Sequence, residues 1–439
     1  MGKKIVIWIF VAGFFLLSLA LSVGILFAGP AQAGANEVLS KPPVLVDKNG
    51  KLNDYFLNDA ATWLKDHFFG RQELISVHNK VVSTAFATSS SDDVILGRND
   101  WLYYEPTLGD YTGTAAATDR EICMAAGNLA LMQEYCQSQG REFAFMIAPN
   151  KNSLYPENMP NYGTVSEKTN AQALHAALDQ KGVSYIDLFA VFGTEEEILY
   201  FAHDSHWNSK GAALGADAIN SAFSVESNYY GADFSGREYH LGDLYEMLYP
   251  SFRDTEENPV YGGALNFTFT SKATKADSIT LETASDAEGS LLCYRDSFGN
   301  LLYPYLADSY GTCRFSRAVS YDLTQEGQTV LIELVERNIS YLYTNLPVMP
   351  APQRELDLPE ATGAVAVQTK EAKTPEAMLQ VKGKLDVVPD DASAIYVVCD
   401  GIVYEAFCLA DNGFGAYVPG EIQAVACYVD GQLTVFSAE

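Results

Sequence analysis

The chain has 439 residues, of which 48% are hydrophobic, and a formal net charge of −28 at pH 7. This length and apolar content suffice for one large domain and a smaller second one. A protein with so strong a negative charge offers no basic face to nucleic acid, so we expect no nucleic-acid partner.

The N-terminus contains an uncharged apolar run, residues 5–28, directly after Lys3 and Lys4. At ~1.5 Å rise per residue a helix of this length spans a hydrocarbon core of ~30 Å. The lysines favour a cytoplasmic N-terminus, which places residues 35–439 outside. Ala31-Gln32-Ala33 resembles a signal-peptidase site, so cleavage after Ala33 is the alternative. The run exceeds the ~7–15 apolar residues of a typical signal peptide, which favours an uncleaved anchor within residues 1–34.

The body begins with a predicted helix over residues 54–86 and two short strands within residues 92–104. Helices and strands then alternate at a spacing that predicts parallel strands with crossover helices. The predicted helices are 118–138, 166–181, 209–223 and 298–309, and the predicted strands are 142–148, 183–188, 290–294, 311–315 and a segment within 330–343. Residues 225–290 interrupt this alternation and are predicted to be an insertion with some β structure.

The predicted fold class is therefore α/β, with a parallel sheet covered by helices on both faces. This domain is assigned residues 35–346. Residues 347–375 contain Pro347, Pro350, Pro352, Pro359 and Pro375, which predicts a linker. Residues 376–439 carry two Asp-Gly dipeptides, Asp400-Gly401 and Asp430-Gly431, between β-branched and aromatic residues. Such dipeptides are typical of hairpins, so a small antiparallel β domain is expected there.

The chain has seven cysteines and no C-x-x-C motif, so neither a zinc ribbon nor a dithiol redox site is supported. Because the number is odd, at least one thiol is free or bonded to another molecule. Buried apolar thiols are the simplest interpretation.

Ser297 follows the apolar strand 291–294 and precedes a predicted helix. A hydroxyl at that point meets the positive end of the helix dipole and free main-chain N–H groups, which can also hold an oxyanion. A helix N-cap is the alternative role for this serine. No G-x-S-x-G motif is present, which disfavours an α/β-hydrolase elbow.

Asp204 and His206 lie two residues apart, just before the predicted helix 209–223. In extended chain such residues face the same side, so the carboxylate can orient the imidazole. The alternative is a structural His-Asp pair at a helix entry. A metal site of His203, Asp204 and His206 lacks the H-x-x-x-H spacing of helical zinc sites and is disfavoured. Ser297, His206 and Asp204 together supply the groups for acyl transfer, which needs no cofactor.

Four sequence blocks resemble the alginate O-acetyltransferase group and the related DHHW proteins, which are SGNH-hydrolase-like. The blocks are Gly97-Arg98-Asn99-Asp100-Trp101-Leu102-Tyr103, Ala148-Pro149-Asn150-Lys151 with Leu154-Tyr155-Pro156-Glu157, Asp204-Ser205-His206-Trp207-Asn208, and Arg295-Asp296-Ser297-Phe298-Gly299-Asn300. The resemblance covers about residues 50–345. Two positions depart from the pattern: Asp100 replaces a glycine, and Ser205 replaces a histidine of the DHHW subgroup.

This resemblance implies an SGNH-like, flavodoxin-like fold, with Ser297 as nucleophile, His206 as base and Asp204 as its orienting carboxylate. Asn300 and Lys151 are candidates for oxyanion or substrate contacts. The implied activity is O-acetylation of a cell-envelope or secreted polysaccharide outside the cytoplasm, with a membrane acetyl-donor protein as an expected partner. A carbohydrate acetylesterase with the same triad is one alternative. A non-catalytic assembly or glycan-binding protein is another.

Overall fold

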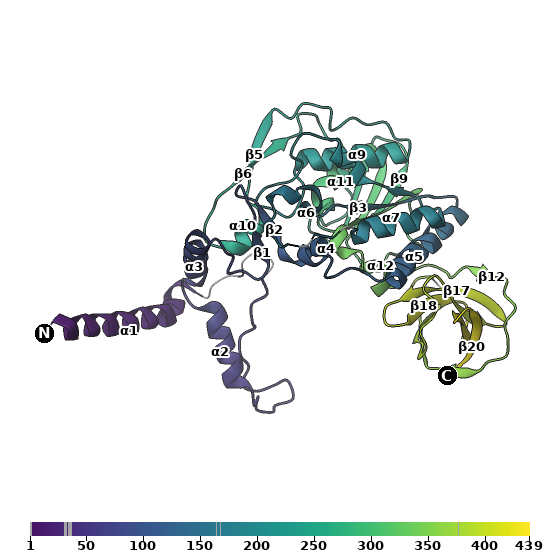
Figure 1. Cartoon of the computed structure of the whole chain (residues 1–439), viewed down its shortest axis with the longest axis horizontal. Coiled ribbons are helices and arrows are strands. Elements are labelled where there is room, and N and C mark those ends of the chain that lie inside the picture. Colours follow the sequence, from purple (N-terminus) through teal and green to yellow (C-terminus); the bar gives the residue numbers. More distant parts are fainter. Residues whose placement is uncertain (1, 30–32, 34–36, 164, 167, 376) are drawn as a thin grey trace.

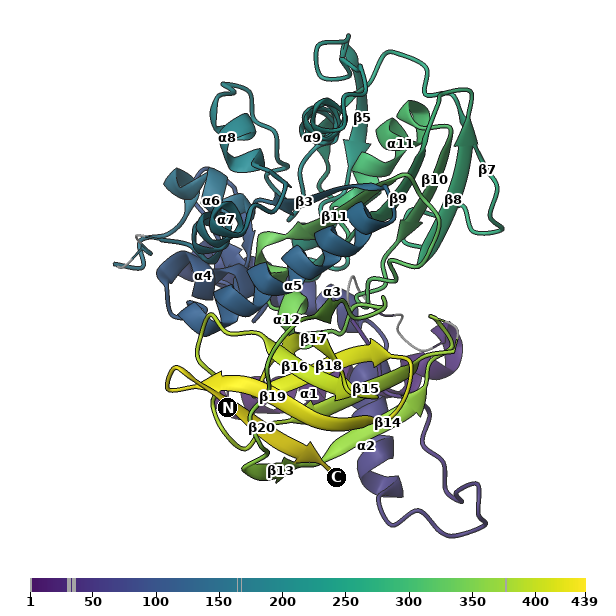
Figure 2. The ribbon, with the colours of Figure 1, turned by 90° about the vertical axis from the view of Figure 1, so that its right-hand side faces the viewer.

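The structure, a computed structural model, describes residues 2–29, 33, 37–163, 165–166, 168–375 and 377–439. A central α/β domain packs against a β domain, and helices near the N-terminus project from the body (Figure 1). Figure 2 shows the main sheet edge-on above the β domain.

The N-terminal region contains three helices, α1 (Gly2–Ala28), α2 (Phe56–His67) and α3 (Arg71–Phe86). Within α1, the stretch Lys4–Ile25 is long and apolar enough to cross a membrane, a test that a signal sequence also passes. Ala31 and Gln32 of the predicted cleavage motif lie outside the described residues. The single helix predicted over 54–86 is wrong, because Gly70, at φ +75°, separates α2 from α3.

The α/β domain is built on a seven-stranded sheet with the order β4-β3-β11-β9-β10-β8-β7. Five strands run parallel: β4 (Tyr185–Ile186), β3 (Glu142–Ala148), β11 (Thr329–Val335), β9 (Ser290–Tyr294) and β10 (Thr312–Ser316). Every residue of β11 is buried, as expected for a central parallel strand covered on both faces. The predicted SGNH-like fold class, with a parallel sheet and helices on both faces, is confirmed.

Helices cover both faces of this sheet, and alternate residues of each strand enter separate cores. Along β3, Phe143, Phe145 and Ile147 join the core under α5 (Asp119–Ser138) and α7 (Asn170–Lys181). Ala144 and Met146 join the core under α9 (Ser209–Ala222) and α11 (Gly299–Ser309). Thr118 and Glu121 form a capping box at the start of α5. Shorter elements are β1 (Val94–Leu96), β2 (Leu102–Tyr104), α4 (Leu108–Thr112), α6 (Lys151–Leu154), α8 (Leu188–Gly193) and α12 (Tyr341–Thr344).

Residues 225–290, predicted as an insertion, divide between two places. β7 (Phe267–Phe269) and β8 (Thr280–Ser285) extend the main sheet, where β8 pairs antiparallel with β10. β5 (Gly236–His240) and β6 (Glu256–Val260) form a separate two-stranded sheet, and α10 (Asp243–Leu248) lies between them in the chain.

The C-terminal β domain is a curled, barrel-like sheet of nine strands (Figure 2). Its strands are β12 (Gln353–Arg354), β13 (Gly363–Val365), β14 (Val367–Glu371), β15 (Leu379–Lys384), β16 (Ile395–Cys399), β17 (Ile402–Leu409), β18 (Gly413–Val418), β19 (Ile422–Val429) and β20 (Gln432–Ala438). The predicted hairpins at Asp400-Gly401 and Asp430-Gly431 are confirmed, and all four residues have positive φ. The predicted linker 347–375 is wrong in part, because it supplies β12, β13 and β14.

The two domains share one hydrophobic core, which combines side chains of α5 and α12 with those of β16–β19. Asn128 of α5 is buried at this junction: it donates to the carbonyls of Leu342 and Cys408 and accepts the Cys408 N–H. Arg354 adds an ion pair to Glu134 of α5. All seven cysteines are free thiols, and six of them are buried, which agrees with the sequence interpretation.

Candidate active site

Ser297 lies on a tight turn between β9 and α11, and the carboxylate of Asp296 holds that turn. Asp296 accepts the N–H groups of Phe298 and Val335 at 2.9 and 2.8 Å, while its own N–H donates to Glu333. A Cβ on Gly299 would lie 2.4 Å from the Arg295 side chain, so the turn requires glycine there. Phe298 occupies the N-cap position of α11 and no side chain caps this helix, so the N-cap role considered for Ser297 is not observed.

The structure brings the three predicted catalytic side chains into one hydrogen-bonded chain. The Ser297 Oγ lies 2.8 Å from His206 Nε2, and His206 Nδ1 lies 2.7 Å from Asp204 Oδ1. With the proton on Nδ1, the imidazole donates to Asp204 and accepts from the Ser297 hydroxyl. That tautomer is the one a general base requires.

Asp204 is a buried carboxylate with four hydrogen-bond donors around it. Its Oδ1 receives His206 Nδ1 and the His206 N–H, and its Oδ2 receives His240 Nε2 and the Asp243 N–H, all within 2.7–2.9 Å. Burial alone would raise the pKa of Asp204, but the charges and hydrogen bonds of His206 and His240 hold it well below its usual value. The carboxylate is therefore ionised and fixed in place.

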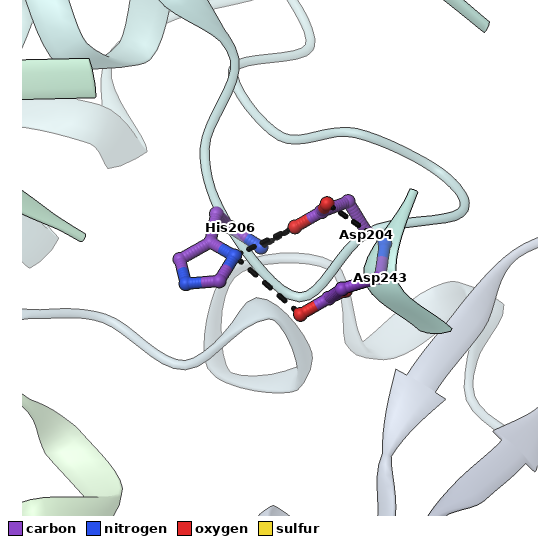
Figure 3. A group of neighbouring side chains, drawn as sticks. All are labelled: Asp204, His206 and Asp243. Carbon is purple, nitrogen blue, oxygen red and sulfur yellow. Dashed lines mark hydrogen bonds and ion pairs between the residues drawn. The ribbon is translucent and has the colours of Figure 1, made fainter. Parts of the chain in front are cut away.

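Asp243 is a second carboxylate beside the imidazole, as Figure 3 shows. Its Oδ2 lies 3.6 Å from His206 Nδ1 and accepts the Ser205 hydroxyl at 2.7 Å. Burial and the charge of Asp204 raise the pKa of Asp243. Burial, the largest effect on His206, lowers the pKa of the imidazole, but Asp204 and then Asp243 outweigh it, so the net pKa is raised.

Asp204, His206 and Asp243 also form a group whose ligand atoms lie within 4.8 Å of one another, a spacing that suits a metal ion. The hydrogen bonding does not suit one. His206 Nδ1 points at a carboxylate as a donor, and both oxygens of Asp204 already accept N–H groups. His203, the third member of the metal site considered from sequence, turns to Asp100 instead, at 3.2 Å. The donor set therefore fits a proton relay better than a metal.

Lys151 and Asn300, the two candidates for oxyanion or substrate contacts, are both engaged in holding loops. Lys151 is buried, and its ammonium donates to the carbonyls of Phe201, Ala202 and Asp204. Burial lowers the pKa of Lys151 to about 8. The Asn300 side chain accepts from Arg295 and donates to Asp277. Lys151 thus supports the segment that carries Asp204, and Asn300 supports the turn that carries Ser297.

Sequence reasoning did not find His240 and Asp243, which come from the region treated as an insertion. Only the folded chain brings them to Asp204, since 36 and 39 positions separate them in sequence. The one local sign of this contact is Gly242, where a side chain would not fit because a Cβ would lie 2.2 Å from the His203 carbonyl. A single glycine close to a histidine and an aspartate is too common in sequences to have predicted that the two segments pack together.

Residues 94–254, which include Asp204 and His206, match the family model of the SGNH hydrolase-like domain, acetyltransferase AlgX. Within these residues the chain matches an SGNH-like acetyltransferase domain. This agrees with the resemblance stated from the sequence blocks and makes the protein an enzyme of the SGNH-like acyltransferase type. No curated protein shows significant similarity to the chain.

Several solved structures are distantly similar to this SGNH-like chain. A structure of PatB1 from Bacillus cereus with a sulfonyl adduct is 19% identical, covers 56% of this chain and 95% of its own, and has a TM-score of 0.42. A DHHW family protein from Eubacterium siraeum is 15% identical, with coverages of 51% and 90% and a TM-score of 0.39. AlgX from Pseudomonas aeruginosa is 12% identical, with coverages of 82% and 93% and a TM-score of 0.38.

Proposed function

We propose that this protein is an extracytoplasmic O-acetyltransferase that transfers an acetyl group through Ser297 to a hydroxyl of a cell-envelope or secreted polysaccharide. One observation carries the proposal: the Ser297 Oγ lies 2.8 Å from His206 Nε2, whose other nitrogen lies 2.7 Å from Asp204. A nucleophile, a base and an ionised orienting carboxylate are thereby in contact before any substrate binds.

The reaction would proceed in two halves. In the first, Ser297 Oγ attacks the acetyl carbonyl while its proton passes to His206 Nε2, and Asp204 stabilises the resulting imidazolium. The tetrahedral intermediate then expels the donor alcohol, which takes the proton from His206, and leaves an acetyl-enzyme. In the second half a glycan hydroxyl gives its proton to His206 and attacks the acetyl carbon. The bond between Ser297 Oγ and the acetyl carbon then breaks, and Ser297 Oγ takes the proton back from His206.

The proposed location follows from α1. Its apolar stretch Lys4–Ile25 has no buried residue among those whose burial is described, and it directly follows Lys3. We propose that it either anchors the body outside the membrane or acts as a signal sequence. A membrane protein that supplies the acetyl group is then the expected donor, and an anchored enzyme would remain close to it.

A carbohydrate acetylesterase is the second candidate, because water and a sugar hydroxyl attack the same acetyl-enzyme. The His206 side chain keeps 22% of its surface exposed, so water can reach the base in the absence of an acceptor. A bound acceptor prevails over water only through its effective concentration at the acetyl-enzyme.

The decisive experiment incubates the purified protein with an acetyl ester, with and without oligosaccharides from the cell envelope, and measures free acetate and product masses. Acetylated oligosaccharide that forms at the expense of acetate supports the transferase. Acetate release that no acceptor alters supports the esterase. A serine-directed phosphonate should label wild type and not Ser297→Ala. Equal labelling of both would exclude Ser297 as nucleophile, and glycan binding without turnover would support a non-catalytic role.

A further inference from the structure

The turns after β9 and β11 meet at one edge of the sheet. The two strands pair in parallel, so their C-terminal ends emerge side by side. Ser297 comes three residues after β9, and Arg337 comes two residues after β11. The Asp296 carboxylate ties the turns together, since it accepts the Val335 N–H at 2.8 Å and the Asn338 amide at 3.2 Å. The segment that carries Arg337 is therefore held beside the turn of the nucleophile by the Asp296 side chain.

The Arg337 guanidinium packs against two aromatic rings, and within the described part of the chain its N–H groups are not engaged in hydrogen bonds. Its central carbon lies 5.6 Å from the centre of the Phe298 ring and 5.2 Å from that of Tyr104. Among the described residues, no acceptor forms a hydrogen bond or ion pair with the Arg337 side chain. Stacking uses the faces of a guanidinium and leaves its in-plane N–H groups available.

Arg337 is also close to the base. The imidazole of His206 packs on the same Phe298 ring, with 4.7 Å between ring centres. Burial and, to a smaller extent, the charge of Arg337 both act to lower the pKa of His206, against the stronger effect of the carboxylates. The neighbouring Glu336 does not neutralise Arg337, because its carboxyl accepts from Asn150 and Ser153.

Acyl transfer needs donors for the negative charge on the carbonyl oxygen, and several polar groups of this region are already engaged elsewhere. The Phe298 N–H is taken by Asp296, and the three ammonium protons of Lys151 go to carbonyls. Asn300 is bonded at both ends of its amide. In the part of the chain that the structure describes, the Ser297 N–H makes no hydrogen bond, so it is available together with Arg337.

We propose that Arg337 is a catalytic residue whose guanidinium, with the Ser297 N–H, binds the oxyanion that forms during acyl transfer. This inference rests on the proposed function of Ser297. As the Ser297 Oγ–carbon bond forms, the carbonyl π pair moves to oxygen and the hydroxyl proton moves to His206. Arg337 donates to that oxygen until the carbonyl re-forms and the leaving alcohol departs with the proton.

The test is steady-state hydrolysis of 4-nitrophenyl acetate by the full-length protein in detergent. This ester carries no anionic group, so binding of a charged substrate does not enter. Arg337→Met keeps apolar contact with Tyr104 and Phe298 but removes the donors, and it should lower kcat on the order of 10²-fold or more while KM stays within about threefold. Arg337→Lys should retain more activity than Arg337→Met, and added guanidinium chloride should partly restore Arg337→Ala. The matched control is Arg98→Met, an exposed arginine near β2, which should retain wild-type kcat.

Two outcomes would overturn the inference. One is an Arg337→Met enzyme with wild-type kcat, and the other is a loss confined to KM for a polysaccharide acceptor. Phosphonate labelling separates this failure from failure of the proposed function. Labelled wild type with unimpaired Arg337 variants removes only the oxyanion role, whereas wild type that is neither labelled nor active removes both. Equal melting temperatures of the variants and wild type would exclude misfolding as the cause of a loss.

Discussion

Replacement of Asp204 by asparagine is the sharpest perturbation of the candidate triad. The two carboxylate oxygens each face one main-chain N–H, from His206 and from Asp243, at 2.9 Å. An amide has only one acceptor oxygen, so its NH2 group must face one of these N–H donors in either orientation. If that NH2 faces His206, Nδ1 becomes an acceptor and the proton moves to Nε2, where it blocks proton transfer from Ser297.

The expected magnitude follows from loss of the charge that stabilises the imidazolium. Removal of this carboxylate in a Ser-His-Asp triad costs about 10⁴-fold in kcat. Asp243 remains 3.6 Å from Nδ1 and supplies part of the missing charge. We therefore expect Asp204→Asn to lose about 10³ to 10⁴-fold, which corresponds to about 4–5.5 kcal/mol of transition-state stabilisation. Asp204→Asn combined with Asp243→Asn should lose more than Asp204→Asn alone.

The assay is hydrolysis of a neutral acetyl ester by wild type, the two single variants and the double variant over a range of pH. Circular dichroism and melting temperature establish that each variant is folded. If Asp204→Asn retained kcat within tenfold of wild type at every pH, the orienting role of Asp204 would be refuted. Losses that simply add in the double variant would show that Asp243 does not substitute for Asp204.

Three further predictions concern the same structure. The base must be neutral and the pKa of His206 is raised, so kcat/KM should fall in acid with a midpoint above pH 6.5. Asp243→Asn removes one of the negative charges that raise the pKa of His206, so it should shift the midpoint to lower pH. An unchanged pH profile in this variant would contradict the reasoning. Chelators and added zinc should leave activity unaltered, since the donors of the triad are used in hydrogen bonds; activity that needs a metal would revive the metal site. Asn128→Ala should lower the free energy of unfolding by about 3 kcal/mol or more, because three main-chain groups at the domain junction lose buried partners, while activity per folded molecule stays unchanged.

Sequence reasoning identified the parts of the fold that depend on local patterns. The apolar runs that became β3, β9 and β11, the capping box of α5 and the Asp-Gly hairpins are all short-range features. The candidate triad was also found this way, since its members lie near the ends of strands in one predicted sheet. That active-site groups gather at the carboxyl ends of parallel strands made their proximity a reasonable prediction.

The errors arose where long-range contacts override composition. Proline-rich residues 347–375 looked like a linker, yet β12, β13 and β14 find partners on β17, β20 and β15. The hydrogen bonds of Asn300 also come from distant residues: its amide oxygen accepts from Arg295, and its NH2 group donates to Asp277. His240 and Asp243 contact Asp204 only because the chain folds back onto that residue, and no local sequence pattern predicts this.

The core shared by the two domains sets a limit on how this protein can be divided. α5 is at once a covering helix of the catalytic sheet and a wall of the C-terminal barrel, with Asn128 bonded to main chain on both sides. Removal of residues 347–439 would strip α5 of its packing against β17 and expose the apolar side chains of the shared core, so the catalytic domain should aggregate when made alone. Because of this shared core, the C-terminal domain is not joined by a flexible linker. A glycan bound to it would be held at a fixed distance and angle from Ser297. Exchange of C-terminal domains between enzymes of this kind should therefore succeed only when α5 and α12 are exchanged with them.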